Sequence, residues 1–166
     1  MSDLTRSPTR SARRARTAAL GSGVEHLVFR ITGEAYALTL AVVREILVVP
    51  TITLVPRAPA HVLGLISVRG HLVTVLDLGV SLGSRAPHAE RLHDLRARVL
   101  LVRGPDDETL GLLVDEVQSV VRLADTDIES PEALGGAVGE HVLGIARRDG
   151  ETLVVLSLTG ALGARP

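Results

Sequence analysis

The sequence contains no cysteine, lysine or tryptophan, and its aromatic residues are one phenylalanine and one tyrosine. Without cysteine there are no disulfides and no thiolate metal sites. Without lysine there is no P-loop, and no G-x-G-x-x-G motif opens a helix, so the sequence lacks a nucleotide-binding motif. With so few aromatic side chains, valine, leucine and isoleucine must fill the core, and these residues suit the pleated faces of β-sheets.

Long apolar runs are also missing. No segment approaches the roughly 18 unbroken apolar residues of a membrane-spanning helix. The pair Arg13-Arg14 is followed only by the short apolar run at 18–20, whereas the apolar region of an export signal needs about 7 to 15 residues. We therefore expect a soluble, cytoplasmic protein with no direct membrane insertion.

Charge is distributed unevenly along the chain. Residues 1–20 hold five arginines and one aspartate, a net charge of +4, which leaves −5 for the remaining 146 residues. A Gly-Ser-Gly hinge at 21–23 follows this segment. Because the segment has too little apolar surface to offset the entropy of ordering, we predict a disordered arginine-rich tail over residues 1–23 and a folded domain over 24–166.

Two segments of the chain, 62–83 and 142–163, align without a gap at an offset of 80 residues, with 9 of 22 positions identical. Composition alone would leave roughly two or three identities. Two copies are too few for a solenoid, so the repeat predicts two paired subdomains within one domain. A weaker match at an offset of 71 sets Val43-Arg44-Glu45-Ile46 against Val114-Asp115-Glu116-Val117, and suggests that the duplication extends further.

The apolar pattern is that of short strands. Alternation on both sides of Gly33-Glu34 predicts a hairpin, and further strands are expected at 61–68, 72–76, 99–102, 110–114 and 117–123. Residues 41–47 are expected to form a helical turn. Asp77 and Ser157, which are equivalent in the repeat, each precede a short apolar segment and are expected to cap a short helix. Both faces of strand 72–76 are apolar, so one should cover the other subdomain or a partner. The pattern predicts an all-β chain built as two small barrels.

Motifs for chemistry are weak. Gly79-Val80-Ser81-Leu82-Gly83 matches the nucleophile-elbow pattern of esterases, but the repeat has Ala161 at the serine position, so capping and packing explain Ser81 better. The six histidines lack metal-ligand spacing, and the acidic run at 106–108 fits a solvated turn. The folded part is acidic and poor in stacking aromatics, which argues against nucleic-acid binding. We expect no metal, no cofactor and no catalytic residue. What remains is a binding module.

The segment PRAPAHVLGLISVRGHLVTVLDL at 56–78 resembles the central signature of the CheW family of chemotaxis coupling proteins. Segments at 36–38, 43–46, 111–117, 128–131 and 144–146 agree in order and spacing. The resemblance implies two five-stranded SH3-like barrels, with short helices, packed as one CheW-like domain. It also implies a non-catalytic adaptor that couples the regulatory domain of a CheA-type histidine kinase to the cytoplasmic tips of methyl-accepting chemoreceptors, recruited to membrane receptor arrays.

The resemblance also implies site residues. Glu45 and Arg69 match positions that matter for kinase and receptor coupling, and we expect the arginine fork to hold the carboxylate and nearby carbonyls, either as a partner surface or as a fold-holding pair. Gly64 matches a position where a side chain would disturb close packing. The expected contact area is completed by Val43, Leu65, Ile66 and Val68, with Ala97 and Arg98 opposite them in a groove between the barrels. The alternative from another class is a small β-barrel protein, outside chemotaxis, that binds a small ligand or nucleic acid.

Overall fold

The structure is a computed structural model that describes residues 23–84, 91–130, 139 and 141–162. The predicted tail except Gly23, parts of two connections and residues 163–166 lie outside these residues. The strands are β1 Val24–Ile31, β2 Glu34–Thr39, β3 Val43–Val48, β4 Val62–Val68, β5 His71–Asp77, β6 Arg98–Arg103, β7 Thr109–Val114, β8 Glu116–Leu123, β9 Ile128–Glu129, β10 Val142–Arg148 and β11 Glu151–Leu156. The helices are short: α2 Leu78–Ser81, α4 Leu158–Leu162 and the 3₁₀ turns η1 Leu40–Val42 and η2 Asp125–Asp127.

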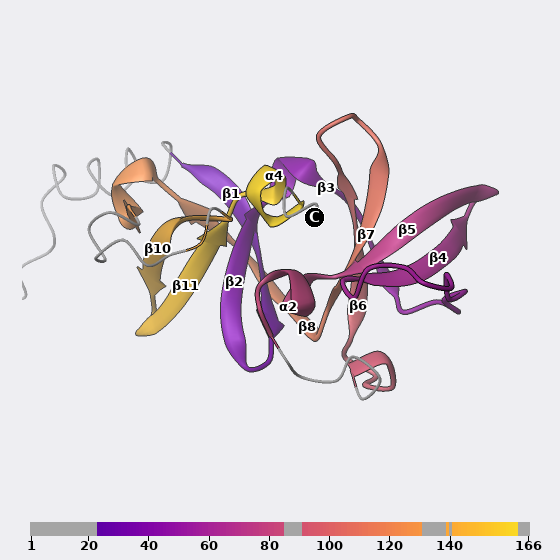
Figure 1. The fold of residues 1–166 in the computed structure, drawn as a ribbon. Helices are drawn as coiled ribbons and strands as arrows, with labels where there is room; N and C mark the ends of the chain where they lie inside the picture. The colour runs from indigo at the N-terminus through magenta and orange to yellow at the C-terminus, as the bar shows by residue number, and fades with distance from the viewer. Residues whose placement is uncertain (1–22, 85–90, 131–138, 140, 163–166) are drawn as a thin grey trace, which may run out of the picture.

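The strands form two curled sheets that lie side by side, with α2 and α4 between them (Figure 1). The six-stranded sheet has the order β8-β1-β2-β11-β10-β9, and the five-stranded sheet has the order β3-β6-β7-β5-β4. Each sheet draws on both halves of the chain, because hairpin β1–β2 joins the C-terminal strands and hairpin β6–β7 joins β3, β4 and β5. The two subdomains are therefore interlocked. The predicted all-β, SH3-like architecture is confirmed.

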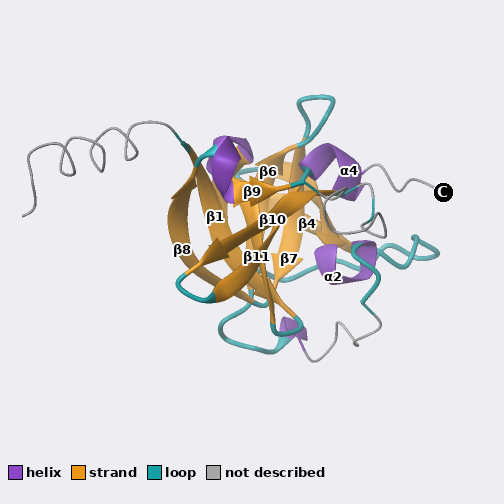
Figure 2. Cartoon of the chain, turned by 90° about the vertical axis from the view of Figure 1, so that its left-hand side faces the viewer, coloured by secondary structure: helices purple, strands orange, loops and turns teal. Residues whose placement is uncertain are grey.

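The sheets differ in two details from the expected pair of five-stranded barrels. Backbone pairing leaves β8 and β9 as the ends of one sheet and β3 and β4 as the ends of the other, so neither sheet closes on itself. The first sheet has six strands because β9 pairs with β10, whereas the five-stranded sheet has only the isolated bridge between Thr53 and Leu65 in that place. Figure 2 shows the six-stranded sheet from its outer side, curling in front of β4, β6 and β7.

The two repeated hairpins have the same backbone. In both, the pairing shifts at the same place, between Val62 and Gly64 in β4–β5 and between Val142 and Gly144 in β10–β11. Both tips are two-residue turns with positive φ at each central position: 49° and 83° at Arg69-Gly70, and 50° and 83° at residues 149–150. This geometry follows the right-handed twist of the strands, which is why glycine stands second in each turn.

The weaker alignment, which matched residues 43–46 with residues 114–117 at an offset of 71, is wrong. Strands β3 and β8 are equivalent edge strands, but the pairing registers place Val117 at the position of Val43 and Ser119 at the position of Glu45. The structural offset is therefore 74 residues, not 71, and Glu116 is not the counterpart of Glu45. Both strands carry a register shift at this place, which supports the duplication even though the matched letters did not reveal its register.

The predicted caps are confirmed. The Asp77 carboxylate accepts a hydrogen bond from the Val80 backbone N at 3.2 Å, and the Ser157 hydroxyl accepts one from the Gly160 backbone N at 3.3 Å. The helical turn expected at 41–47 is wrong beyond its start: only Leu40–Val42 is helical, and β3 begins at Val43. Val43, Ile46 and Val48 are β-branched, and the segment pairs with β6; this tertiary pairing decides its conformation.

Three apolar clusters fill the part of the molecule that the structure describes. One lies inside the five-stranded sheet and contains Leu63, Ile66, Val73, Val75, Ala97, Val99, Leu101 and Leu113. A second, around Val155, lies inside the six-stranded sheet. The third joins the sheets, since it combines Leu27 and Phe29 of one with Leu100 and Leu112 of the other. Strand β5 contributes to two of them, because Val75 faces the inner cluster and Leu76 the cluster between the sheets. The second apolar face of this strand thus covers the other subdomain.

Candidate functional site

Glu45 and Arg69 form an ion pair across the gap between the two end strands of the five-stranded sheet. Glu45 lies on β3 and Arg69 follows β4, so the pair spans the two end strands, which no backbone bond joins. Arg69 Nη2 lies 3.0 Å from Glu45 Oε2 and 3.1 Å from Oε1. The predicted contact is present, but it uses a single nitrogen, and among the described residues Arg69 bonds no carbonyl. The predicted fork that also holds carbonyls is therefore wrong.

A groove surrounds this pair; we call it the mouth groove. It has a volume of about 430 Å³ and is lined by Arg44, Glu45, Val68, Arg69, His71, Leu72, Val73, Leu101, Glu108 and Thr109. Arg44 fixes its far side, because Nη1 donates to the Thr109 hydroxyl at 2.8 Å and Nη2 to Asp107 at 3.1 Å. Leu72 is 74% exposed at its rim. The groove therefore offers charges of both signs beside an accessible aliphatic side chain, a combination suited to a protein partner.

The six-stranded sheet has the equivalent groove with different chemistry. It measures about 220 Å³ and is lined by Val28, Gln118, Ser119, Val121, Arg148, Asp149, Glu151 and Leu153. Ser119 stands where the mouth groove has Glu45, and Asp149 stands where it has Arg69. No ion pair joins these two positions among the described residues. The common fold therefore does not require the Glu45–Arg69 pair.

Several other predicted residues do not line the mouth groove. Leu65 is half-buried on β4 and pairs with Thr53, and Val43 is half-buried against the cluster between the sheets. Arg98 begins β6 and turns its guanidinium back onto its own loop, donating at 2.7 Å to the carbonyls of Leu95 and Ala97. Of the predicted set, Glu45, Val68 and Arg69 line the groove.

Ile66 and Ala97 are corrected by the structure. They are 2% and 1% exposed and belong to the cluster inside the five-stranded sheet. Ala97 therefore does not line a groove between the barrels, and the space between the sheets is packed with apolar side chains. The alternation of β4 explains the error for Ile66, because successive side chains of a strand point to opposite faces and only one face can be accessible.

Gly64 has a structural role at this position. Its φ is +150°, and a Cβ there would overlap the backbone oxygen of Thr53 and lie 2.8 Å from Ile52 Cγ2. Gly144 has the same environment, with a Cβ that would overlap the backbone oxygen of Glu129. In both copies the absence of a side chain lets a second segment pack against the hairpin. The predicted intrusion of a side chain at Gly64 is confirmed as a packing constraint.

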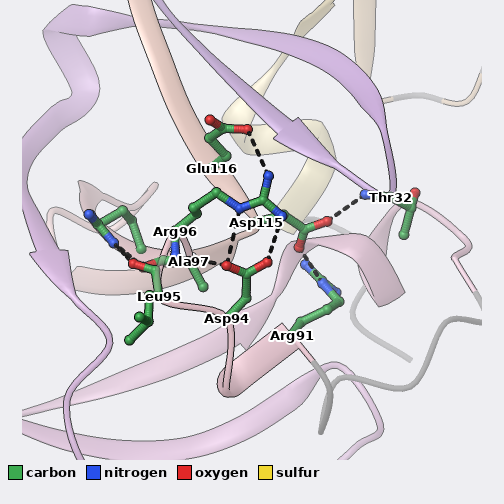
Figure 3. A network of polar contacts seen from close by, with 9 residues as sticks. Thr32, Arg91, Asp94, Leu95, Arg96, Ala97, Asp115 and Glu116 are labelled. Atoms are coloured by element: carbon green, nitrogen blue, oxygen red, sulfur yellow. Dashed lines mark hydrogen bonds and ion pairs between the residues drawn. The ribbon is translucent and has the colours of Figure 1, made fainter.

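Arg91 forms a buried network that the sequence did not indicate. Its Nη1 donates to Asp77 Oδ1 at 2.6 Å. Its Nε donates to Asp115 Oδ1, and Figure 3 shows this second contact. The side chains of Arg91 and Asp77 are 9% and 0% exposed. Burial alone would lower the pKa of Arg91, but the hydrogen bonds that it donates to Asp115 and Asp77 outweigh this effect, and the pKa is raised. A lone arginine in a polar connection carries no sequence signal of such a partner.

Comparison with known proteins decides the family. The family model of the CheW-like domain matches residues 25–165. The chain belongs to the CheW-like domain family. The family resemblance inferred from the segment at 56–78 is thereby confirmed.

Similar proteins cover most of this CheW-like chain. The chemotaxis protein CheW of Rhizobium meliloti (strain 1021) is 28% identical over 137 residues, which cover 82% of this chain and 85% of the relative. The chemotaxis protein CheW of Bacillus subtilis (strain 168) is 26% identical, covering 88% and 91%. The crystal structure of the scaffolding protein TtCheW from Thermoanaerobacter tengcongensis has a TM-score of 0.75 and 25% identity, and covers 86% of this chain and 94% of that one.

The remaining candidate sites give no competing chemistry. The Ser81 hydroxyl donates to the Asp77 carbonyl at 3.2 Å, a contact within the turn of α2. Among the described residues, no group of three histidine, aspartate or glutamate side chains is placed to hold a metal ion. Within the same residues, no helix is long and apolar enough to cross a membrane.

Proposed function

We propose that this CheW-like chain is a non-catalytic adaptor that couples a CheA-type histidine kinase to chemoreceptors and is recruited, in the cytoplasm, to their membrane arrays. The family match over residues 25–165 carries the proposal. Relatives that cover most of the chain are named chemotaxis proteins, and a structural neighbour is described as a scaffolding protein.

The mouth groove is the proposed kinase-binding surface, with Arg69 at its centre. The Arg69 side chain is 77% exposed and that of Glu45 33%. Exposed pairs of this kind contribute little to folding, and the equivalent positions of the other sheet lack the pair. An arginine held at a hairpin tip in a groove is instead one of the residue types that most often dominate the binding energy of an interface, and exposed Leu72 adds apolar contact area beside it.

The test is calorimetric titration of the purified chain with the kinase regulatory domain and, separately, with a receptor-tip fragment. The Arg69→Ala variant is expected to lose kinase binding. Arg148→Ala is the matched control, because Arg148 precedes the equivalent turn of the other sheet and lines its groove. Wild-type chain that binds neither fragment would refute the adaptor function. Kinase binding of wild-type affinity in Arg69→Ala would refute the assignment of the mouth groove alone.

A further inference from the structure

Arg91 lies where the two interlocked sheets exchange strands. Its partner Asp77 ends β5 of the five-stranded sheet. Its other partner, Asp115, is the single residue between β7 of that sheet and β8 of the six-stranded sheet. The guanidinium therefore binds one carboxylate on a sheet and one at the point where the chain crosses to the next sheet.

Asp115 extends this connection into the six-stranded sheet. Its second oxygen, Oδ2, accepts a hydrogen bond from the Thr32 backbone N at 2.6 Å, in the turn between β1 and β2 (Figure 3). Its backbone N donates to the Arg30 carbonyl at 2.9 Å on β1. One charged network thus links the end of β5, the crossing segment and the β1–β2 hairpin.

The chemistry of this network favours a fixed geometry over simple stability. An apolar cluster could fill the same volume without desolvating charges, and buried ion pairs are often no more stabilising than apolar residues of similar size. Apolar contacts tolerate sliding, since the hydrophobic effect has no direction. The planar guanidinium with its fixed donors instead requires both carboxylates at set angles. Slippage of one sheet past the other would leave buried charges without partners.

We propose that Arg91, with Asp77 and Asp115, is an inter-sheet clamp that sets the relative orientation of the two sheets. The mouth groove and the equivalent groove of the six-stranded sheet lie on different sheets, so the clamp also sets the relative orientation of these two grooves. Arg96 provides the contrast. It belongs to the same connection, pairs with Asp94 at 2.9 Å and lies 3.9 Å from Glu116 of β8, but its side chain is 68% exposed, so water screens both pairs.

The experiment measures the inter-sheet distance directly, in the free protein, and so does not depend on the proposed function. The sequence has no cysteine, so spin labels can be placed at Leu72→Cys on β5 and Thr152→Cys on β11, two exposed and equivalent positions. Pulsed dipolar spectroscopy then gives the distance distribution. A second pair, Leu72→Cys with Arg103→Cys, lies within the five-stranded sheet and reports on that sheet alone.

In the Arg91→Met background we expect the inter-sheet distribution to shift or at least double in width, while the distribution within one sheet keeps its width. Arg96→Met should change neither. An unchanged inter-sheet distribution, or equal broadening of both pairs, would overturn the proposal, because the apolar cluster would then set the orientation or the variant would be loosened throughout. If Arg91→Met does not fold, Asp115→Asn is measured against the same criteria, since it keeps the size of the side chain and removes its charge.

Discussion

Arg69→Ala should separate binding from folding. The change removes two contacts of 3.0 and 3.1 Å between Arg69 Nη2 and the Glu45 carboxylate. Because the two side chains are 77% and 33% exposed, water replaces the lost partner and no buried charge remains. Exposed pairs of this kind contribute about 0 to 1 kcal/mol. The backbone adds nothing to the difference, since arginine and alanine bear the same strain at the φ of 49°.

We therefore expect the midpoint temperature of thermal unfolding to fall by no more than about 2 to 4 °C, because a loss of about 1 kcal/mol corresponds to such a shift in a protein of this size. Binding should respond far more strongly. If Arg69 is central to the kinase interface, its truncation costs about 2 kcal/mol or more, which weakens the affinity roughly 30-fold. Thermal unfolding followed by circular dichroism measures the first quantity, and calorimetric titration with the kinase regulatory domain measures the second.

Two results would refute this reasoning. A decrease of more than about 10 °C in the midpoint temperature of unfolding would show that the ion pair holds the two end strands of the sheet together. That result would contradict the expectation that so exposed a pair adds little stability. An affinity equal to that of the wild type would show that the mouth groove is not the kinase surface. The Arg148→Ala variant should match the wild type in both measurements, because its side chain is half exposed and its ion-pair contact with Asp149 is long, at 3.7 Å.

Three further predictions concern stability. Arg91→Met leaves two carboxylates without their buried partner and should cost about 3 to 5 kcal/mol in the free energy of unfolding, measured by urea denaturation; a loss below about 1 kcal/mol would contradict the buried network. Gly64→Ala and Gly144→Ala should each destabilise by about 1 to 3 kcal/mol, since each Cβ would overlap a backbone oxygen, and near-neutral values would be inconsistent with that packing. The pKa of Tyr36 is raised to about 12, chiefly by burial. Since the folded state favours the neutral phenol, the contribution of Tyr36 to the free energy of unfolding is present below pH 10 and is lost as the pH rises to 12. Tyr36→Phe should therefore lose less stability than the wild type between pH 10 and 12, and parallel plots of unfolding free energy against pH would argue against this reasoning.

Some features of the fold could be predicted because neighbours in the sequence decide them. The hairpin tips depend on a glycine at the second turn position, and the caps depend on Asp77 and Ser157 standing before short apolar segments. The contact between Glu45 and Arg69 could be named only through the family resemblance. Nothing local relates a residue of β3 to a turn after β4, because the curvature of the sheet brings its two end strands together.

Other features were predicted wrongly, each for a physical reason. The helical turn at 41–47 gave way to β3 because cross-strand pairing with β6 outweighs local preference. Ile66 and Ala97 were placed on a surface through the family resemblance, which does not tell which side chains of this chain are buried. The alignment at an offset of 71 failed because four similar letters can match without structural equivalence; the strand pairing keeps an offset of 74 throughout, since both strands carry the register shift at the same place.

The sequence by itself determined the all-β class, the duplication, the turns and caps, and the family, because these depend on local conformation and on the order of motifs. Only the tertiary structure decided that the two halves exchange strands, that Ile66 and Ala97 are interior, and that Arg91 binds two buried carboxylates. The reason is distance along the chain. Sheet order and burial arise from contacts between residues far apart in the sequence, and a charge shows its partner only when folding has brought the two together.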